Sequence, residues 1–132
     1  MSIRVIVCGS RNYSDFDESF KVLLRLFGQV LPDVEIVSGT CRGGDMCGEH
    51  FASVCGLPVS RFPADWNRFG KSAGPRRNEQ MLQYALQANA FVVAFWDGAS
   101  KGTRNMVQIA RQAGVPVCVV KPGSYPISPI WS

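Results

Sequence analysis

The sequence predicts an α/β fold: a single Rossmann-like, three-layer α/β/α domain on a mainly parallel sheet of about five strands. Short β-branched apolar runs alternate along the chain with segments of helical periodicity. The runs are too apolar to face water on either side, which is typical of parallel strands covered by helices on both faces. The length of 132 residues fits one domain with a full core.

The first part of the chain contains a strand, a helix and a second strand. Residues 3–9 form a β-branched run that ends in Gly-Ser, and residues 34–39 form the second apolar run. Asp15 and Glu18 have the spacing of a capping box, which predicts the start of a helix between them. The apolar face of this helix is formed by Phe20, Leu23, Leu24 and Phe27.

The middle of the chain repeats the alternation. A helix is expected over residues 44–54, ended by Gly56, and a third strand over residues 57–62. A long loop at residues 63–74 precedes a helix that has Pro75 in its first turn. The apolar stripe of that helix is formed by Met81, Leu82, Ala85 and Leu86.

The last part begins with the most hydrophobic run, residues 90–96, which we expect in the centre of the sheet. A helix over residues 103–112 leads to a last strand at residues 116–120. Residues 1–121 are therefore the expected domain. Residues 122–132 form a Pro-rich tail expected to be irregular, with Trp131 docked on a surface.

Composition narrows the class of protein. No apolar run approaches the roughly 20 residues that span a bilayer, and the first residues lack a signal peptide. We therefore expect a cytoplasmic protein with no membrane partner. The five cysteines include no C-x-x-C pair, so reduced thiols are expected rather than disulfides or a metal site. A net charge of +4 favours an anionic partner.

Polar residues gather at one edge of the predicted sheet. In a parallel sheet all strand-to-helix turns meet at the carboxyl edge, where ligands bind. The turns expected there are residues 9–11, 38–45, 63–74 and 97–103, whereas the opposite edge receives only "LPD", "CGLP", "QAN" and "AGVP". Eight of the 14 Lys and Arg lie in or beside the polar turns: Arg11, Arg42, Arg68, Lys71, Arg76, Arg77, Lys101 and Arg104. Cations near helix N-termini are unfavourable without an anion, so an anionic ligand is predicted at this edge.

Two of these turns have features of a phosphate cradle. "SGTCRGGD" has glycines at 39, 43 and 44 between a strand and a helix, without P-loop or dinucleotide-fingerprint spacing. A tight turn without a ligand is the alternative there. "DGASKGT" brings small residues, Ser100 and Thr103 to a helix N-terminus, which suits a phosphate. Asp45 either caps its helix or binds a ribose hydroxyl or a metal-held water, and Asp97 is placed to take a sugar hydroxyl.

Three further features allow more than one interpretation. Trp66 and Phe69 among cations suit the stacking of a nucleobase, and a covering flap over the core is the alternative. His50 is the only histidine, so neither a Ser-His nor a Cys-His nucleophile pair is expected and His50 is interpreted as structural. Cys41, beside Arg42, is interpreted as an inert loop thiol rather than a reactive one.

Five segments in order carry a family resemblance: "GSRNYSD", "VSGTCRGGD", "FPADW", "GKSAGPRRNEQM" and "AFWDGASKGT". Over about residues 3–120 they closely resemble the YspA/YpsA-related branch of the SLOG superfamily. The superfamily includes the LOG phosphoribohydrolases and the DNA-processing protein DprA (Smf). The resemblance implies a Rossmann-like fold that binds nucleotides or nucleotide-derived ligands, and it favours a homodimer.

The comparison with LOG enzymes is incomplete at one position. Their catalytic arginine lies in an R-K-x-x-M segment, which "RNEQM" resembles with Arg77 in the arginine position. Their phosphate loop reads P-G-G-x-G-T-x-x-E, and alignment on Gly102 and Thr103 puts Met106 at the glutamate. A methionine can neither transfer a proton nor stabilise an oxocarbenium-like transition state. Asp97, Asp45 and Glu79 are the remaining candidate carboxylates.

The predicted function is the binding of a nucleotide, or an NAD- or ADP-ribose-like ligand, by a sensor or sequestering module with no metal and no other cofactor. A LOG-like phosphoribohydrolase or N-glycosidase with a displaced carboxylate is the first alternative, with Arg77, Asp45 and Asp97 as catalytic residues. A DprA-like binder of single-stranded nucleic acid is the second. The expected ligand-binding residues are Gly9, Ser10, Arg11, Ser38, Gly39, Arg42, Gly43, Gly44, Asp45, Asp65, Trp66, Lys71, Arg77, Asn78, Asp97, Gly98, Ser100, Gly102 and Thr103.

Overall fold

The computed structural model of the chain describes residues 2–125 and 131–132. Its centre is a sheet of five parallel strands in the order β3-β2-β1-β4-β5. The strands are β1 (Ile3–Gly9), β2 (Val34–Ser38), β3 (Val59–Arg61), β4 (Asn89–Phe95) and β5 (Val117–Val120). The predicted α/β class and the parallel sheet are confirmed.

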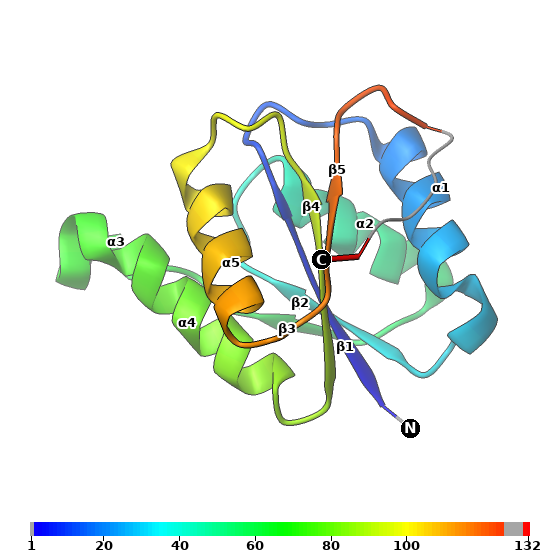
Figure 1. The fold of residues 1–132 in the computed structure, drawn as a ribbon, viewed down its shortest axis with the longest axis horizontal. Helices are drawn as coiled ribbons and strands as arrows, with labels where there is room; N and C mark the ends of the chain where they lie inside the picture. Colours follow the sequence, from blue (N-terminus) through cyan, green and yellow to red (C-terminus); the bar gives the residue numbers. More distant parts are fainter. Residues whose placement is uncertain (1, 126–130) are drawn as a thin grey trace.

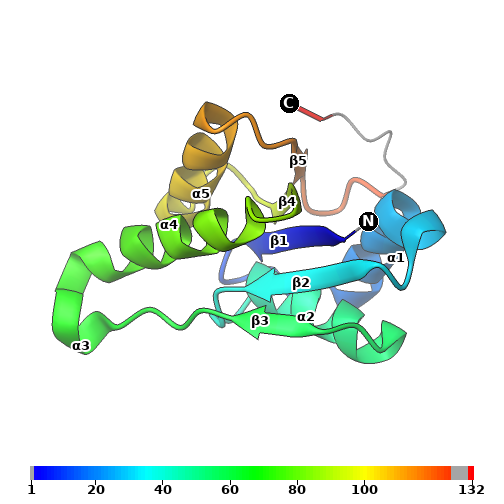
Figure 2. The same cartoon turned by 90° about the horizontal axis from the view of Figure 1, so that it is seen from below.

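Helices cover both faces of this sheet (Figures 1 and 2). One face carries α1 (Phe16–Phe27) and α2 (Gly44–Cys55), and the other carries α4 (Ala73–Ala85) and α5 (Lys101–Gln112). Side chains of β1 alternate between the two resulting cores, with Val5 and Val7 in one and Ile6 and Cys8 in the other. The three-layer Rossmann-like architecture follows from this alternation.

The centre of the sheet is β1 rather than β4. β4 lies between β1 and β5, so it is an interior strand but not the middle one, and the sequence-based placement was wrong by one strand. Both strands are covered by helices on both faces, and Val92, Val93, Ala94 and Phe95 are fully buried. The hydrophobicity of a strand indicates that helices cover both of its faces. All interior strands share this property, so it does not show which of them is the middle one.

One of the two hydrogen bonds of the expected capping box forms at the start of α1. The backbone N–H of Glu18 donates to Oδ1 of Asp15 over 2.9 Å. The Glu18 carboxylate does not return to Asp15; it accepts hydrogen bonds from the Tyr13 hydroxyl at 2.8 Å and from the backbone N–H groups of Gly123 and Tyr125. The helix start thereby anchors the segment that follows β5. Leu24, expected on the apolar face, is 43% exposed.

The predicted loop at residues 63–74 is largely helical. It contains the short helix α3 (Trp66–Phe69) and the 3-10 helix η2 (Gly70–Ser72), after which α4 begins at Ala73. Asp65 caps α3 by accepting from the N–H of Arg68 at 3.1 Å, a start signal that sequence reasoning missed. Together α3, η2 and the first turn of α4 form an arm that projects beyond the sheet (Figure 2).

Several element ends differ from expectation. α5 begins two residues early, at Lys101, because Ser100 is its N-cap. Leu86 follows the last residue of α4 and is 42% exposed, so it is not part of the apolar stripe. A second 3-10 helix, η1 (Gly28–Val30), continues α1.

Part of the predicted tail packs on the domain. Trp131 pairs antiparallel with Cys118 of β5 and makes edge contacts with the rings of Phe27 and Phe91, at centroid distances of 6.2 and 5.4 Å. Trp131 is thus docked as expected, and the rest of the tail prediction, at residues 126–130, lies outside the described residues. Within the described part of the chain, no helix is both long and apolar enough to cross a membrane.

Candidate functional site

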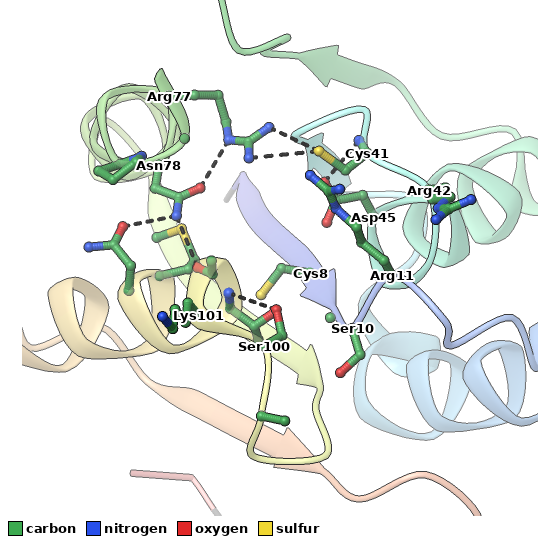
Figure 3. A pocket seen from close by; sticks show the side chains of 18 of the residues that line it. Cys8, Ser10, Arg11, Cys41, Arg42, Asp45, Arg77, Asn78, Ser100 and Lys101 are labelled. Atoms are coloured by element: carbon green, nitrogen blue, oxygen red, sulfur yellow. Dashed lines mark hydrogen bonds between the residues drawn. The ribbon is translucent and has the colours of Figure 1, made fainter. Parts of the chain in front are cut away.

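A pocket of about 870 Å³ opens at the carboxyl edge of the sheet (Figure 3). Its size lies in the range of roughly 300–1,000 Å³ typical of small-molecule sites. The turns after β1, β2 and β4 form three walls, and the arm with the start of α4 forms the fourth. The structure brings these predicted residues into its lining: Gly9, Ser10, Arg11, Arg42, Asp45, Trp66, Lys71, Arg77, Asn78, Asp97, Ser100, Gly102 and Thr103.

Six predicted site residues do not line the pocket: Ser38, Gly39, Gly43, Gly44, Asp65 and Gly98. Asp65 caps α3, and the Ser38 hydroxyl donates to Oε2 of Glu49 at 2.6 Å. The three glycines between β2 and α2 pack against other parts of the protein. Gly98 differs from them, since a Cβ there would meet no atom within 4 Å.

The glycines before α2 let two loops touch through their backbones. A Cβ on Gly44 would lie 2.4 Å from both Cα and N of Gly9, and a Cβ on Gly43 would lie 2.2 Å from the carbonyl oxygen of Ser10. Gly43 also has a φ of 92°, which side chains rarely adopt. The N–H of Gly44 donates to Ser10 O at 3.2 Å. The tight-turn interpretation of Gly43 and Gly44 is the one that this geometry supports.

The turn before α5 is built differently. Ser100 Oγ accepts from the N–H of Thr103 and lies 3.1 Å from Thr103 Oγ1, which caps the helix internally. A Cβ on Gly98 or Gly102 would meet no atom within 4 Å. The N–H groups of Lys101 and Gly102 donate to no protein acceptor in the described part of the chain. This helix start is open toward a ligand.

Arg77 forms the wall opposite α5 and is 8% exposed. Its Nη1 donates to Gly39 O at 2.5 Å, its Nε donates to Asn78 Oδ1 at 3.0 Å, and both Nη atoms lie within 3.9 Å of Cys41 Sγ. Asn78 in turn donates to Gly102 O at 3.2 Å. One chain of hydrogen bonds therefore fixes the guanidinium relative to both helix starts.

Asp45 lies beside Arg77 and is 7% exposed. Burial raises the pKa of its carboxyl to about 6, although the positive charge of Arg77 opposes the shift. Gly39 makes room for both side chains, because a Cβ there would lie 2.6 Å from Arg77 Nη1 and 2.7 Å from Asp45 Oδ2. Glycine at position 39 thus lets a carboxylate and a guanidinium share one wall.

Asp97 is the second carboxylate of the pocket and is exposed. It accepts hydrogen bonds from the N–H of Ala99 at 2.9 Å and from the hydroxyl of Ser10 at 3.1 Å. The bond from Ala99 is the main reason that the pKa of Asp97 lies below its usual value. Asp97 is therefore ionised at neutral pH, whereas the pKa of Asp45, about 6, lies close to neutral pH.

The position of the LOG glutamate is filled by Met106, which is 1% exposed and lines the pocket. α5 carries no Asp or Glu at all, so this helix supplies no carboxylate to the site. Glu79 is exposed, receives a hydrogen bond from Gln83 and lies outside the lining. Asp45 and Asp97 are thus the carboxylates that the pocket contains.

Sequence reasoning left out of its site ten lining residues: Cys8, Asn12, Cys41, Gly74, Pro75, Met81, Ala99, Lys101, Asn105 and Met106. Lys101 and Asn105 had a usable signal, since both belong to the first turns of the helix behind a suspected phosphate turn. Cys8 and Met81 are apolar positions of a strand and a helix, which predict core. Their place at the floor of the pocket depends on tertiary packing.

Aromatic residues of the arm behave unequally. Trp66 lines the pocket, is 47% exposed and packs over Gly74, so it does not plug the core. Phe69 lies outside the lining, with the guanidinium groups of Arg68 and Arg76 over its ring at 4.9 and 4.4 Å. Of the two stacking candidates, Trp66 alone reaches the pocket.

His50 lies where a structural residue would, whereas Cys8 and Cys41 line the pocket. The His50 ring stacks on Phe16 at a centroid distance of 4.9 Å, away from the pocket lining. Cys8, Cys41, Cys47 and Cys55 are free thiols. In the ranges that the structure describes, no group of three or more His, Cys, Asp or Glu is arranged to hold a metal ion.

The lining carries more positive than negative charge. Five cations, Arg11, Arg42, Lys71, Arg77 and Lys101, face two carboxylates. Ion pairs among the described residues join Arg4 to Glu35, Lys21 to Asp17 and Arg61 to Glu49, and none involves a pocket cation. The positive potential of the pocket is left to attract an anion.

Comparisons with known proteins agree with this architecture. The profile of the YspA, cpYpsA-related SLOG family (YAcAr) matches residues 3–69, just over half of the chain. The X-ray structure of DNA processing protein A (DprA) from Streptococcus pneumoniae is similar in fold, with a TM-score of 0.70 at 16% identity. The similarity covers 96% of this chain and 52% of that chain, so this chain spans about half the length of DprA. A search of curated proteins found no match.

Proposed function

The chain belongs to the YspA, cpYpsA-related SLOG family, and from this premise we propose that its pocket binds a nucleotide or nucleotide-derived ligand as a sensor or sequestering module. Family and fold support a binding module related to nucleotides or nucleic acids in general. The observation that carries the finer proposal is the open start of α5, which faces a pocket whose cations are unpaired.

The phosphate subsite is assigned to the first turn of α5. The N–H groups of Lys101 and Gly102 point along the helix dipole toward the pocket end of the helix and have no protein partner among the described residues. The Lys101 ammonium adds a mobile charge, and the hydroxyls of Ser100 and Thr103 add donors once their mutual hydrogen bond opens. Charge-assisted hydrogen bonds of this kind are the strong ones in phosphate recognition.

Calorimetric titration with AMP, ADP-ribose, NAD and cyclic nucleotides tests the proposal, together with analysis of the purified protein for bound nucleotide. At least one ligand should bind, and Lys101→Ala should weaken it by about tenfold, the equivalent of about 1.4 kcal/mol. Arg25→Ala removes one cation from the last turn of α1, far from the pocket, and serves as the matched control. No binding by any of these ligands contradicts the proposal.

A second candidate function is hydrolysis of an N-glycosidic bond. The observation in its favour is Asp45, a pocket carboxyl that titrates near pH 6 beside the fixed guanidinium of Arg77. Protonated Asp45 would give its proton to the leaving base while water adds to C1′ of the ribose, and the water would return a proton to Asp45, so that free base and a ribose phosphate result. Chromatography of nucleoside monophosphates after incubation detects free base, and Arg77→Ala should abolish its release. Release that survives this change contradicts the role of Arg77.

A third candidate is binding of single-stranded nucleic acid, with DprA, a DNA processing protein by its title, as the structural neighbour. The observation in its favour is the projecting arm, where Trp66 is exposed and the guanidinium groups of Arg68 and Arg76 lie over the ring of Phe69. Binding of an oligonucleotide should then fall steeply with salt and depend on Trp66. A flat salt dependence excludes it.

A homodimer, proposed from family resemblance, is tested by sedimentation.

A further inference from the structure

Asp45 is a buried carboxylate with an unused acceptor. Its Oδ2 accepts a hydrogen bond from the N–H of Cys41 at 3.2 Å, whereas Oδ1 accepts none from any described residue and is open to the solvent of the pocket. An ionised carboxylate offers about four acceptor positions, and buried polar groups are normally satisfied. Because Asp45 lines the pocket, the missing donor is expected to come from what occupies the pocket.

The chemistry of that donor is restricted. A phosphate at neutral pH offers mainly acceptors and is repelled by an ionised carboxylate, so an ionised Asp45 does not suit a phosphate subsite. Figure 3 shows Asp45 on the opposite side of the pocket from Ser100 and Lys101, with Cys8 between them. A ligand with its phosphate at the start of α5 extends from there toward Asp45.

Arg77 keeps the unused acceptor of Asp45 available for a ligand. The two side chains share the space above Gly39, yet the guanidinium donates to Gly39 O and Asn78 Oδ1 rather than to Asp45. No ion pair joins them in the described part of the chain. The positive charge of Arg77 nevertheless favours the ionised form of Asp45.

We propose that Asp45 accepts a hydrogen bond from a ribose hydroxyl, so that the pocket selects ribonucleotides over their deoxy analogues. This inference rests on the proposed function and names the ligand class within it. Ribose hydroxyls are the neutral donors closest to the phosphate of a nucleotide. A site built around such a hydrogen bond disfavours ligands that lack the hydroxyl, because the carboxylate oxygen then loses its donor within the occupied pocket.

Binding of AMP, 2′-deoxy-AMP, 3′-deoxy-AMP and IMP is measured by calorimetry at about pH 8, where Asp45 is ionised. We expect at least one deoxy analogue to bind the native protein about tenfold or more weakly than AMP, and IMP to bind about as AMP does. In Asp45→Asn, AMP should weaken and the ratio between AMP and that analogue should collapse toward about twofold. Asp33→Asn, an exposed carboxylate before β2, should keep the native ratio.

The outcomes separate this inference from the proposed function. Equal binding of AMP and both deoxy analogues by the native protein overturns the inference and leaves nucleotide binding standing. An equal loss of all ligands in a folded Asp45→Asn also overturns it, since Asp45 then acts through the loop at Cys41. If Asp45→Asn instead changes the ratio between AMP and IMP, the donor to Asp45 belongs to the base, which contradicts the inference. If AMP fails to bind at millimolar concentration the inference also fails, and the wider ligand series decides the proposed function separately.

Discussion

The starts of α2 and α5 look alike in sequence and differ in construction. Both follow a strand of the same sheet and both carry glycines at the turn. At the start of α2 there is no room for a side chain, because a Cβ on either glycine would lie 2.2–2.4 Å from backbone atoms at the end of β1 and in the turn after it. At the start of α5 a Cβ on Gly98 or Gly102 would meet nothing within 4 Å. The first turn of α2 carries Asp45, and the first turn of α5 carries Lys101 and no acid.

Because of this difference, the two turns that both suggested a phosphate cradle have different roles in the pocket. The turn before α2 is a rigid wall that holds a carboxylate and touches a guanidinium. The turn before α5 is the open, cationic end. A glycine-rich turn is therefore evidence for a ligand only when its backbone is not already occupied by the protein itself.

Gly44→Ala should give the largest effect. The added Cβ would lie 2.4 Å from the backbone of Gly9, and backbone atoms have no alternative rotamer. We expect the free energy of unfolding to fall by about 3 kcal/mol or more, measured by denaturant titration. A loss below about 1 kcal/mol would show that the two turns are not held together as described.

Asp45→Asn should change how stability depends on pH. In the folded protein the carboxyl keeps its proton up to a pKa of about 6, above its ordinary value of 3.8, so folding takes up a proton between these values. The stability of the native protein relative to the variant should therefore fall as pH rises through this window, by about 3 kcal/mol in all.

Urea titrations of the native protein and Asp45→Asn at several pH values between about 3.5 and 7.5 make this comparison. Above pH 7 the difference between them should be constant. A difference that grows in favour of the native protein as pH rises would mean that Arg77 outweighs burial and that the pKa of Asp45 is lowered.

Ser100→Ala should have a moderate effect. The variant loses the side-chain cap that accepts from the N–H of Thr103, which costs about 1 kcal/mol of unfolding free energy. Ser53→Ala, at an exposed interior position of α2, is the matched control and should be neutral or slightly stabilising. Thermal denaturation followed by circular dichroism compares them; equal melting temperatures would show that Ser100 does not cap α5.

Gly102→Ala should have the smallest effect on stability and the most informative effect on binding. No atom lies near the added Cβ, and alanine suits a helix better than glycine, so the protein should be unchanged or more stable by up to about 1 kcal/mol. Nucleotide affinity should nevertheless fall, because the methyl group intrudes where the phosphate approaches the backbone. Unaltered affinity in calorimetry would place the phosphate elsewhere.

Periodicity and turn chemistry were sufficient for the fold. They predicted five parallel strands, four of the helices and the edge at which polar turns meet, because these depend on local patterns and on the geometry of parallel sheets. They missed α3, whose four residues are too few to show a period and whose only signal is the cap at Asp65. They also misplaced the sheet centre, since strand order depends on which connections cross over.

The pocket itself was predictable only in part. Charged and small residues of the turns, such as Arg11 and Lys101, could be assigned to its edge. The floor, with Cys8 and Met81, could not, because an apolar residue at a pocket and one in a core have the same pattern. The approach of Arg77 and Asp45 to each other above Gly39 brings together residues far apart in the sequence and required the packing of α4 on the sheet.

The most direct test of phosphate binding at the open start of α5 is an amide NMR titration of the isotope-labelled protein with AMP. The N–H signals of Lys101, Gly102 and Thr103 should show the largest shifts, and these should vanish in Lys101→Ala at the same AMP concentration. Signals that move only in the arm at Trp66 to Phe69, or at Gly43 and Gly44, would contradict the assignment of the phosphate to α5.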